Sequence, residues 1–185
     1  MNIQSNSSVC GVKKRRFEPL FMRRILVIGC PGGGKTTFAS KLGERLSIPV
    51  HHLDKYFWRE NWTPAPQDEF RGILHTLMQE PRWIIDGNYA RTIDVRIPFA
   101  DTIILFDFSK ILNLWRSLKR FFQNLGRVRP DMGGGNKERL EWKHTKFIIT
   151  FPRKAFAEKV ATLAKGKNLI VLHNPREAQD FLNGL

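Results

Sequence analysis

The chain has 185 residues, of which 42% are hydrophobic and 26% are charged, and its formal net charge is +14. This length suits one α/β domain, and the composition excludes a disordered or low-complexity chain. No apolar run is long enough to predict a membrane-spanning helix. The two cysteines, Cys10 and Cys30, cannot form a disulfide framework, which favours a reduced, cytoplasmic setting.

The positive charge is concentrated in two segments. Residues 1–24 carry six basic residues and one acid, and residues 110–167 carry fifteen basic residues and four acids. The rest of the chain is close to neutral. This pattern predicts an anionic partner at one face of the molecule, but charge alone does not distinguish a nucleotide, a nucleic acid and a membrane surface.

Residues 1–21 differ in character from the rest of the chain. A polar start is followed by the basic run 13–16, and the apolar core of a secretory signal is absent from this segment. Met22 stands directly before the first expected strand. We expect a single domain over 22–185, with 1–21 as a disordered basic tail or the product of a start codon assigned upstream. A nucleic-acid-binding arm is the third alternative.

From residue 24 onward, strand and helix patterns alternate, which is typical of βαβ units and a parallel sheet. The expected strands are 24–29, 49–54, 83–86, 102–108 and 168–172, and the first expected helices are 35–46 and 67–79, with 176–182 closing the chain.

About sixty residues separate the last two expected strands, which is more than one crossover helix needs. They predict a helix over 111–125, a loop over 127–135, and a second helix over 137–164 that is interrupted at Pro152. The apolar stripe of the first of these helices is predicted to face the core; it consists of Leu112, Trp115, Leu118 and Phe122.

Residues 29–36, Gly-Cys-Pro-Gly-Gly-Gly-Lys-Thr, match the phosphate-binding pattern G-x-x-x-x-G-K-[ST] at every fixed position. The glycines let backbone amides surround a phosphate chain, and the helix that follows adds the positive end of its dipole. Lys35 would reach the β- and γ-phosphates of ATP, and the Thr36 hydroxyl would bind Mg²⁺. Cys30 stands at a variable position and is interpreted as a spacer. The other expected nucleotide contacts are Gly29, Pro31, Gly32, Gly33, Gly34 and Thr37.

Three expected strands end in or near an aspartate, at the sheet edge where ligands bind in open parallel sheets. Asp86 is the strongest candidate, as the acid that holds Mg²⁺ directly or through water. Asp54 is the candidate for contact with a phosphoryl acceptor, as its base. For Asp107 we favour a helix cap. His51 and His52 lie on opposite faces of a strand, one of them is interpreted as packing, and no structural zinc is predicted.

Three segments carry a resemblance to the P-loop nucleotide kinase superfamily. They are the loop at 29–36, the His-His-Leu-Asp sequence at 51–54, and Trp-Ile-Ile-Asp-Gly-Asn-Tyr-Ala-Arg-Thr at 83–92. Asp86-Gly87 followed by Arg91-Thr92 is similar to the Asp-Gly-Phe-Pro-Arg-Thr segment of adenylate kinases, with one extra residue before the arginine. Across 22–183 the chain looks closest to the adenylate-kinase-related bacterial "DNA topology modulation protein" family. Further residues that fit that family are Trp58, Trp62, Trp115-Arg116, 129–132 and 151–153.

The resemblance implies a P-loop NTPase fold: a three-layer α/β/α domain with a five-stranded parallel sheet in the order 2-3-1-4-5. It also implies ATP with Mg²⁺, and a helical basic lid over about 110–153. By position, Arg91 would contact the acceptor or the transferring phosphate, and the lid arginines would be Arg116, Arg120, Arg127 and Arg129. Arginine suits this role because its planar fork binds phosphate oxygens bidentately. The region between the second and third strands is shorter than in adenylate kinases, so the resemblance leaves AMP as the acceptor open.

Two functions follow from these residues. The first is transfer of the γ-phosphoryl group of ATP to a small acceptor, such as a nucleoside, a nucleotide or a related metabolite. The second is a nucleic-acid-associated NTPase that affects DNA topology through its basic lid and tail. We favour the kinase because its candidate residues point to one crevice, and because the sequence holds no helix-turn-helix, zinc-finger or RNA-binding signature. We expect no membrane partner, and the oligomeric state stays open.

Trp58 and Trp62 follow Asp54 at spacings of four residues. They either stack on an acceptor or pack the loop against the sheet, and the sequence does not separate these two roles.

Overall fold

The computed structural model describes residues 22–124 and 142–185. Within these ranges, one sheet contains five parallel strands: β1 (Arg24–Gly29), β2 (Val50–His52), β5 (Trp83–Asp86), β6 (Thr102–Phe106) and β7 (Asn168–Leu172). Their spatial order is β2-β5-β1-β6-β7. Counting these strands along the chain, this is the 2-3-1-4-5 order that the resemblance to nucleotide kinases implies.

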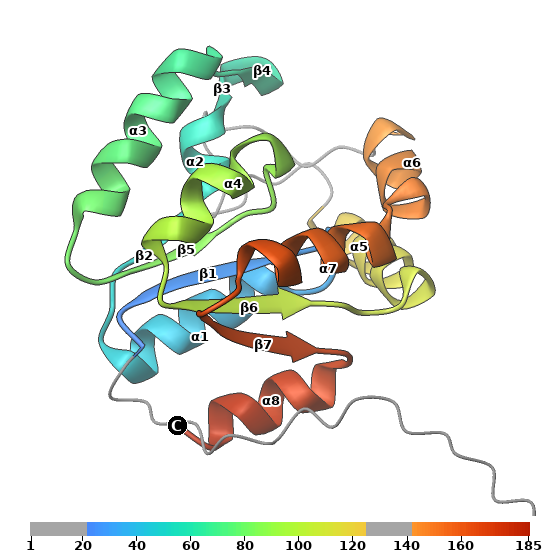
Figure 1. Cartoon of the computed structure of the whole chain (residues 1–185). Helices are drawn as coiled ribbons and strands as arrows, with labels where there is room; N and C mark the ends of the chain where they lie inside the picture. Colours follow the sequence, from blue (N-terminus) through green and yellow to red (C-terminus); the bar gives the residue numbers. More distant parts are fainter. Residues whose placement is uncertain (1–21, 125–141) are drawn as a thin grey trace, which may run out of the picture.

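Helices cover both faces of this sheet (Figure 1). Because successive strand residues point to opposite faces, Leu26 and Ile28 belong to one core and Ile25 and Val27 to the other. The first core packs against α3 (Gln67–Gln79), α4 (Ile93–Arg96) and α7 (Arg153–Leu163). The second packs against α1 (Lys35–Leu46) and α8 (Pro175–Asn183). The three-layer α/β/α architecture is therefore confirmed.

Two of the expected strands are shorter in the structure. The second ends at His52 because residues Leu53–Phe57 form a short helix, α2. This places Asp54 in the first turn of a helix rather than at the end of a strand. The fourth ends at Phe106 instead of residue 108. A small antiparallel pair, β3 (Trp58–Arg59) and β4 (Thr63–Pro64), follows α2.

The long connection before β7 contains α5 (Lys110–Asn124) and α6 (Trp142–Thr150), which contact each other. The predicted break at Pro152 is confirmed, since α6 ends at Thr150 and α7 begins at Arg153. The expected loop at 127–135 and the expected helix start at Lys137 lie outside the described residues. No helix in the described part of the chain is long and apolar enough to span a bilayer.

The predicted inward stripe of α5 is wrong at two positions. Leu112 and Leu118 are half-buried, but Trp115 is 58% exposed and Phe122 is 73% exposed. The helix instead buries Asn113 completely, against the glycine loop after β1. Periodicity identified an apolar face of the helix, but the packing against the loop turns part of that face toward solvent.

Candidate functional site

The glycine loop joins β1 to α1 and is packed directly against α5. Gly32 and Gly34 have φ values of +83° and +87°, which side chains rarely adopt. A Cβ built on Gly32 would lie 2.2 Å from the Asn113 backbone oxygen, and one built on Gly34 would lie 3.0 Å from Nη2 of Arg116. Glycine is therefore required at both positions, and the Arg116 guanidinium lies against the loop.

The start of α1 has the properties of an anion site. Gly34 is the N-cap residue, no side chain caps this end of the helix, and its first turn contains no acid. The first amides of the helix are therefore left for an anion to satisfy. Thr36 is half-buried in the first turn, whereas Thr37 is exposed. The loop, the helix start and the Thr36 hydroxyl fit a phosphate chain with its Mg²⁺ ion.

Lys35 bonds to the loop and its pKa is influenced by the two carboxylates. Its Nζ donates to the Cys30 carbonyl oxygen at 3.0 Å. Burial lowers the pKa of the Lys35 ammonium, and the charges of Asp86 and Asp54 oppose this shift, whereas Arg120 adds to it. All three charged groups therefore act on the same ammonium. Burial also raises the pKa of the Cys30 thiol, which agrees with a spacer rather than a nucleophile.

Asp86 ends β5 and is only 5% exposed. Nδ1 of His52 lies 3.1 Å from its Oδ2, and Nε2 of the same ring lies 3.3 Å from Oγ of Ser40 on α1. Carboxylate and hydroxyl oxygens are the ligands that Mg²⁺ prefers, so Asp86 and Thr36 fit this ion. Among the described residues, no group of three or more His, Cys, Asp or Glu side chains could hold a metal.

His51 has separate partners on the other side of β2. Its Nδ1 lies 3.1 Å from the Tyr56 hydroxyl, and its Nε2 lies 3.1 Å from Oε2 of Glu80. His51 therefore packs away from the phosphate loop, as expected for one of the two histidines. The sequence did not identify His52 as the partner of Asp86.

Asp54 accepts a hydrogen bond of 2.6 Å from the Tyr89 hydroxyl to its Oδ1. The Tyr89 ring packs against Phe57 and Phe70. Burial and the nearby Asp54 carboxylate raise the pKa of the Tyr89 phenol far above its ordinary value, so the phenol remains a donor. Sequence reasoning missed Tyr89, although it stands inside the segment that carries the kinase resemblance.

The segment after Tyr89 contains two arginines with different environments. Arg91 lies in the 3₁₀ helix η3 (Ala90–Thr92) and is exposed. Arg96 lies in α4 and is completely buried. Sequence reasoning missed Arg96, and the available signal was an arginine at helical spacing among Ile93, Ile97 and Ala100, which are all buried.

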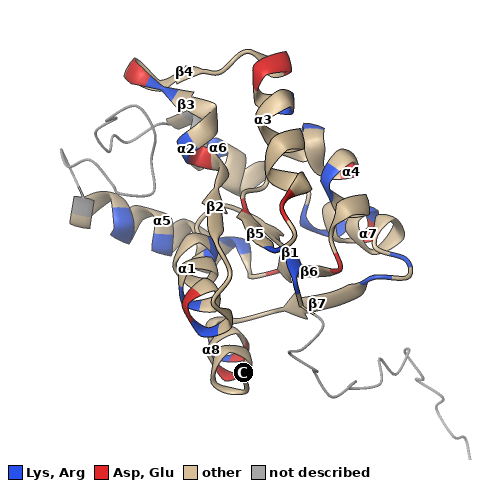
Figure 2. Cartoon of the chain, turned by 90° about the vertical axis from the view of Figure 1, so that its left-hand side faces the viewer, with Lys and Arg blue, Asp and Glu red and all other residues tan. Residues whose placement is uncertain are grey.

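The segment that the resemblance implies as a basic lid is described only in part. Arg116 and Arg120 are half-buried on α5; the Arg116 guanidinium lies against Gly34, and the charge of Arg120 lowers the pKa of Lys35. Figure 2 shows the basic positions along this helix. Arg127 and Arg129 lie outside the described residues, so their predicted lid role stays a prediction.

Trp58 and Trp62 are half-buried and contact each other edge to face, with ring centroids 5.6 Å apart. Trp58 also lies edge to face with Phe57, at 4.9 Å. These contacts show that the pair packs within the α2–β3–β4 region. Stacking on an acceptor stays a prediction.

The predicted capping role of Asp107 is not what the structure shows. Asp107 accepts from Nε and Nη2 of Arg153, at 2.6 and 3.1 Å, and lies 3.7 Å from Nδ1 of His173. Ser109 takes the capping position instead, since its Oγ accepts from the Leu112 amide. Asp107 therefore connects the end of β6 to the start of α7.

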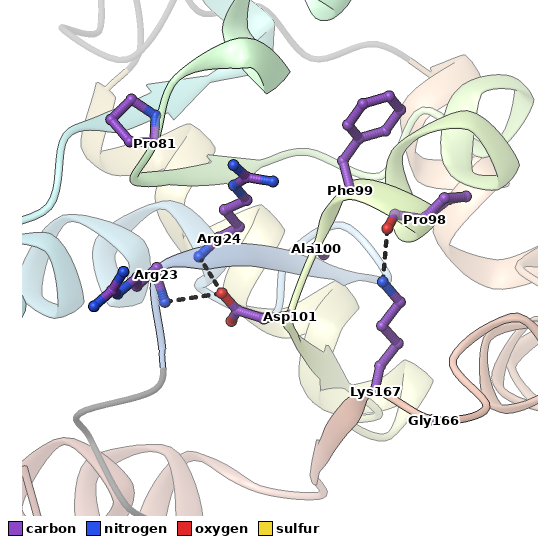
Figure 3. A pocket seen from close by; sticks show the side chains of 9 residues that line it. All are labelled: Arg23, Arg24, Pro81, Pro98, Phe99, Ala100, Asp101, Gly166 and Lys167. Atoms are coloured by element: carbon purple, nitrogen blue, oxygen red, sulfur yellow. Dashed lines mark hydrogen bonds between the residues drawn. The ribbon is translucent and has the colours of Figure 1, made fainter.

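A cavity of about 610 Å³ lies at the amino ends of the strands, on the opposite edge of the sheet from the glycine loop (Figure 3). Asp101 Oδ2 accepts there from the Arg23 and Arg24 amides, and Lys167 Nζ donates to the Pro98 oxygen. Because no candidate site residue lines this cavity, it is separate from the site above.

Several of the solved structures that resemble the chain are kinases of small molecules. A shikimate kinase from Bacteroides thetaiotaomicron has a TM-score of 0.51 at 18% identity, covering 88% of this chain and 95% of its own. A shikimate kinase from Acinetobacter baumannii, in complex with shikimate, has a TM-score of 0.52 at 16% identity, with coverage of 88% and 90%. A putative kinase from Chloroflexus aurantiacus has a TM-score of 0.50 at 17% identity, with coverage of 86% and 94%.

This chain has the P-loop kinase fold. At these identities the likeness establishes the fold alone. No protein-family model matches the chain, and no curated protein is significantly similar to it. The resemblance to the DNA topology modulation family therefore stays a prediction.

Proposed function

We propose that the protein is an ATP-dependent phosphotransferase that moves the γ-phosphoryl group of ATP to a small acceptor. The observation that carries this proposal is the arrangement around Lys35. Its ammonium bonds to the glycine loop and is influenced by Asp54, Asp86 and Arg120 together. A phosphate-binding loop, two carboxylates and an arginine at one sheet edge are the groups that phosphoryl transfer requires.

In this proposal, the loop amides and Lys35 bind the phosphates, and Thr36 and Asp86 hold the Mg²⁺ ion. The ion, when bound, neutralises charge on the β- and γ-phosphate oxygens. Arg116 lies against Gly34 and is therefore placed to reach a phosphate held by the loop. Its planar fork would stabilise the charge on the transferring group.

Asp54 is the proposed base. The acceptor oxygen forms its bond to the γ-phosphorus while the bond from that phosphorus to the β,γ-bridging oxygen breaks, and ADP leaves. The proton of an acceptor hydroxyl passes to the Asp54 carboxylate. Tyr89 supports this role because it donates to Oδ1 and so fixes the orientation of the carboxylate.

The acceptor class is proposed to be a nucleoside, a nucleotide or a related metabolite. Support comes from the sequence resemblance to nucleotide kinases and from the aromatic residues beside Asp54. Phe57, Trp58 and Trp62 contact one another in series close to this carboxylate in the chain. Aromatic rings of this kind can bind the flat face of a base or a sugar ring.

The test is an acceptor screen with the full chain, ATP and Mg²⁺, with ³¹P NMR and mass spectrometry to detect products. We expect one class of small acceptor to be phosphorylated and the Lys35→Ala variant to be inactive. Lys41→Ala is the matched control, because Lys41 is an exposed lysine on the same helix, α1. ATP hydrolysis that DNA accelerates at physiological salt, with no small molecule phosphorylated, would contradict the proposal and favour the nucleic-acid alternative.

A further inference from the structure

Arg96 is a completely buried cation that the proposed chemistry does not use. Its guanidinium donates to four backbone carbonyls, all within residues 87–92. Nη1 donates to Gly87 at 2.9 Å, and Nη2 donates to Asn88 at 2.7 Å and Tyr89 at 3.3 Å, while Nε donates to Thr92 at 3.3 Å. Hydrogen bonds from this one side chain therefore hold the backbone of residues 87–92 in place.

The backbone of residues 87–92 has an uncommon conformation at two positions. Gly87 has φ +147°, and a Cβ at this position would lie 2.8 Å from the Cβ of Leu53. Tyr89 has φ +28° and ψ 65°, outside the regions that non-glycine residues favour. Such a conformation persists only when the surrounding contacts determine it. Arg96 supplies these contacts. The amide and hydroxyl of Thr92 add to them, because both donate to the Tyr89 carbonyl oxygen, at 2.9 and 3.0 Å.

This segment lies between the two carboxylates of the candidate site. It begins directly after Asp86, and it contains Tyr89, whose hydroxyl donates to Asp54 at 2.6 Å. Releasing the backbone at Tyr89 would therefore move the donor that orients the Asp54 carboxylate. Burial lowers the pKa of Arg96 to about 10, and Tyr89, Asp86 and Asp94 oppose the shift, so the cation is retained at neutral pH.

We propose that Arg96 is a positioning residue, which holds the Asp54 carboxylate in its working orientation through the 87–89 backbone and the Tyr89 hydroxyl. The inference rests on the proposed function, because Asp54 is the proposed base. A purely structural role for Arg96 makes a different prediction. It would change the stability of the protein without any specific coupling to Tyr89.

The test compares Arg96→Lys, Tyr89→Phe and the double variant with the wild type. A lysine keeps the charge but cannot reach the same four carbonyls with a fixed fork. We expect each single variant to lower kcat by about 10–100-fold, the range typical of residues that orient a ligating or catalytic group. ATP affinity should remain within about twofold, because the phosphate loop is untouched. The double variant should be no slower than the slower single variant, because both changes remove the same interaction.

The control is Arg82→Lys, since Arg82 also donates to a backbone carbonyl, that of Leu46 at 2.9 Å, but is exposed. Multiplicative effects of the two changes on kcat, or an Arg96→Lys variant with wild-type kcat, would overturn the inference. Thr92→Val is the milder second variant, because it removes only the Oγ1 donor to the Tyr89 oxygen. It should lower kcat less than Arg96→Lys and show the same lack of additivity with Tyr89→Phe.

A measurement without turnover separates this inference from the proposed function. The chain has two tyrosines, so the Tyr56→Phe variant leaves Tyr89 as the only one. With ¹³C-labelled tyrosine, its ring carbons can then be followed by NMR at neutral pH. We expect the Cζ resonance of Tyr89 to shift when Arg96→Lys is added, because the hydrogen bond from its hydroxyl to Asp54 is weakened. An unchanged resonance would overturn the positioning role, whether or not the protein proves to be a kinase.

Discussion

His52 and Asp86 are register partners on the neighbouring parallel strands β2 and β5, and the His52 ring lies 3.1 Å from the Asp86 carboxylate. The same ring reaches Ser40 on α1, the helix that begins at the phosphate loop. The proposed Mg²⁺ carboxylate is therefore held in place by a side chain that itself contacts the helix after the glycine loop.

Replacing His52 should weaken the metal site. In a His52→Phe variant, Asp86 loses its partner at Oδ2 while the ring volume is kept. We expect an apparent Mg²⁺ affinity, or kcat/KM, about 10–100-fold lower, as is typical when a group that orients a metal ligand is lost. Titration of activity with Mg²⁺ at saturating ATP measures the change. A His51→Phe variant is the control, because His51 contacts Tyr56 and Glu80 instead. Equal Mg²⁺ dependence in both variants would contradict the assignment.

Gly32→Ala should abolish nucleotide binding. The added Cβ would lie 2.2 Å from the Asn113 backbone oxygen, and φ at this position is +83°. The loop must therefore change shape and lose several contacts with the phosphates. We expect the Kd for ATP to rise by at least about 100-fold as a result. Gly72→Ala is the matched control, because nothing lies within 4 Å of its added Cβ and the residue is within α3. That variant should bind ATP normally and be more stable by about 0.5–1 kcal/mol.

The pH dependence of ATP binding should report the environment of Lys35. Burial lowers the pKa of this ammonium below 10.5, so it loses its proton at a lower pH than an ordinary lysine. The charged form binds phosphate, so affinity should be lost as the pH rises through the lowered pKa, by up to about tenfold per pH unit. The Kd of the wild type should therefore approach that of Lys35→Ala at alkaline pH. Measurements in a Cys30→Ala background remove the titration of the thiol. Plots of the Kd for ATP against pH that stay parallel with and without the Lys35→Ala change would contradict the prediction.

Arg96→Met should destabilise the fold. The variant keeps an unbranched side chain but removes the guanidinium donor from four carbonyl oxygens, of which only that of Tyr89 keeps the amide and hydroxyl donors of Thr92. We expect a loss of about 2–4 kcal/mol in the free energy of unfolding, measured by urea denaturation. Arg82→Met, at an exposed position, should change it by less than about 0.5 kcal/mol. Equal losses in the two variants would show that the buried contacts of Arg96 contribute little.

The sheet and its glycine loop could be predicted because their signals are local. Continuous apolar strands, helical spacing and the pattern at 29–36 predicted the five strands and the loop, and the resemblance to nucleotide kinases implied the 2-3-1-4-5 order, which the structure confirms. The errors occur where tertiary packing decides. Asp54 lies in a helix turn because α2 begins at Leu53, and Trp115 is exposed because Asn113 takes the place against the loop.

The contacts that complete the site could not be predicted from the sequence. His52 meets Asp86 only through the register of β2 and β5, and Tyr89 meets Asp54 across 35 residues of chain. Arg96 donates to backbone carbonyls, and every residue has one, so the order of side chains does not indicate which carbonyls it binds. Each of these residues was visible in the sequence, but its partner depends on a backbone path that spacing does not encode.

Calorimetric titration of the full chain with ATP in the presence of Mg²⁺ tests the central claim most directly. We predict saturable binding of one nucleotide per chain, and its loss in both Lys35→Ala and Gly32→Ala. Heat signals without saturation in the wild type, or binding that survives both substitutions, would show that the loop after β1 is not the nucleotide site and would remove the basis for the proposed phosphoryl transfer.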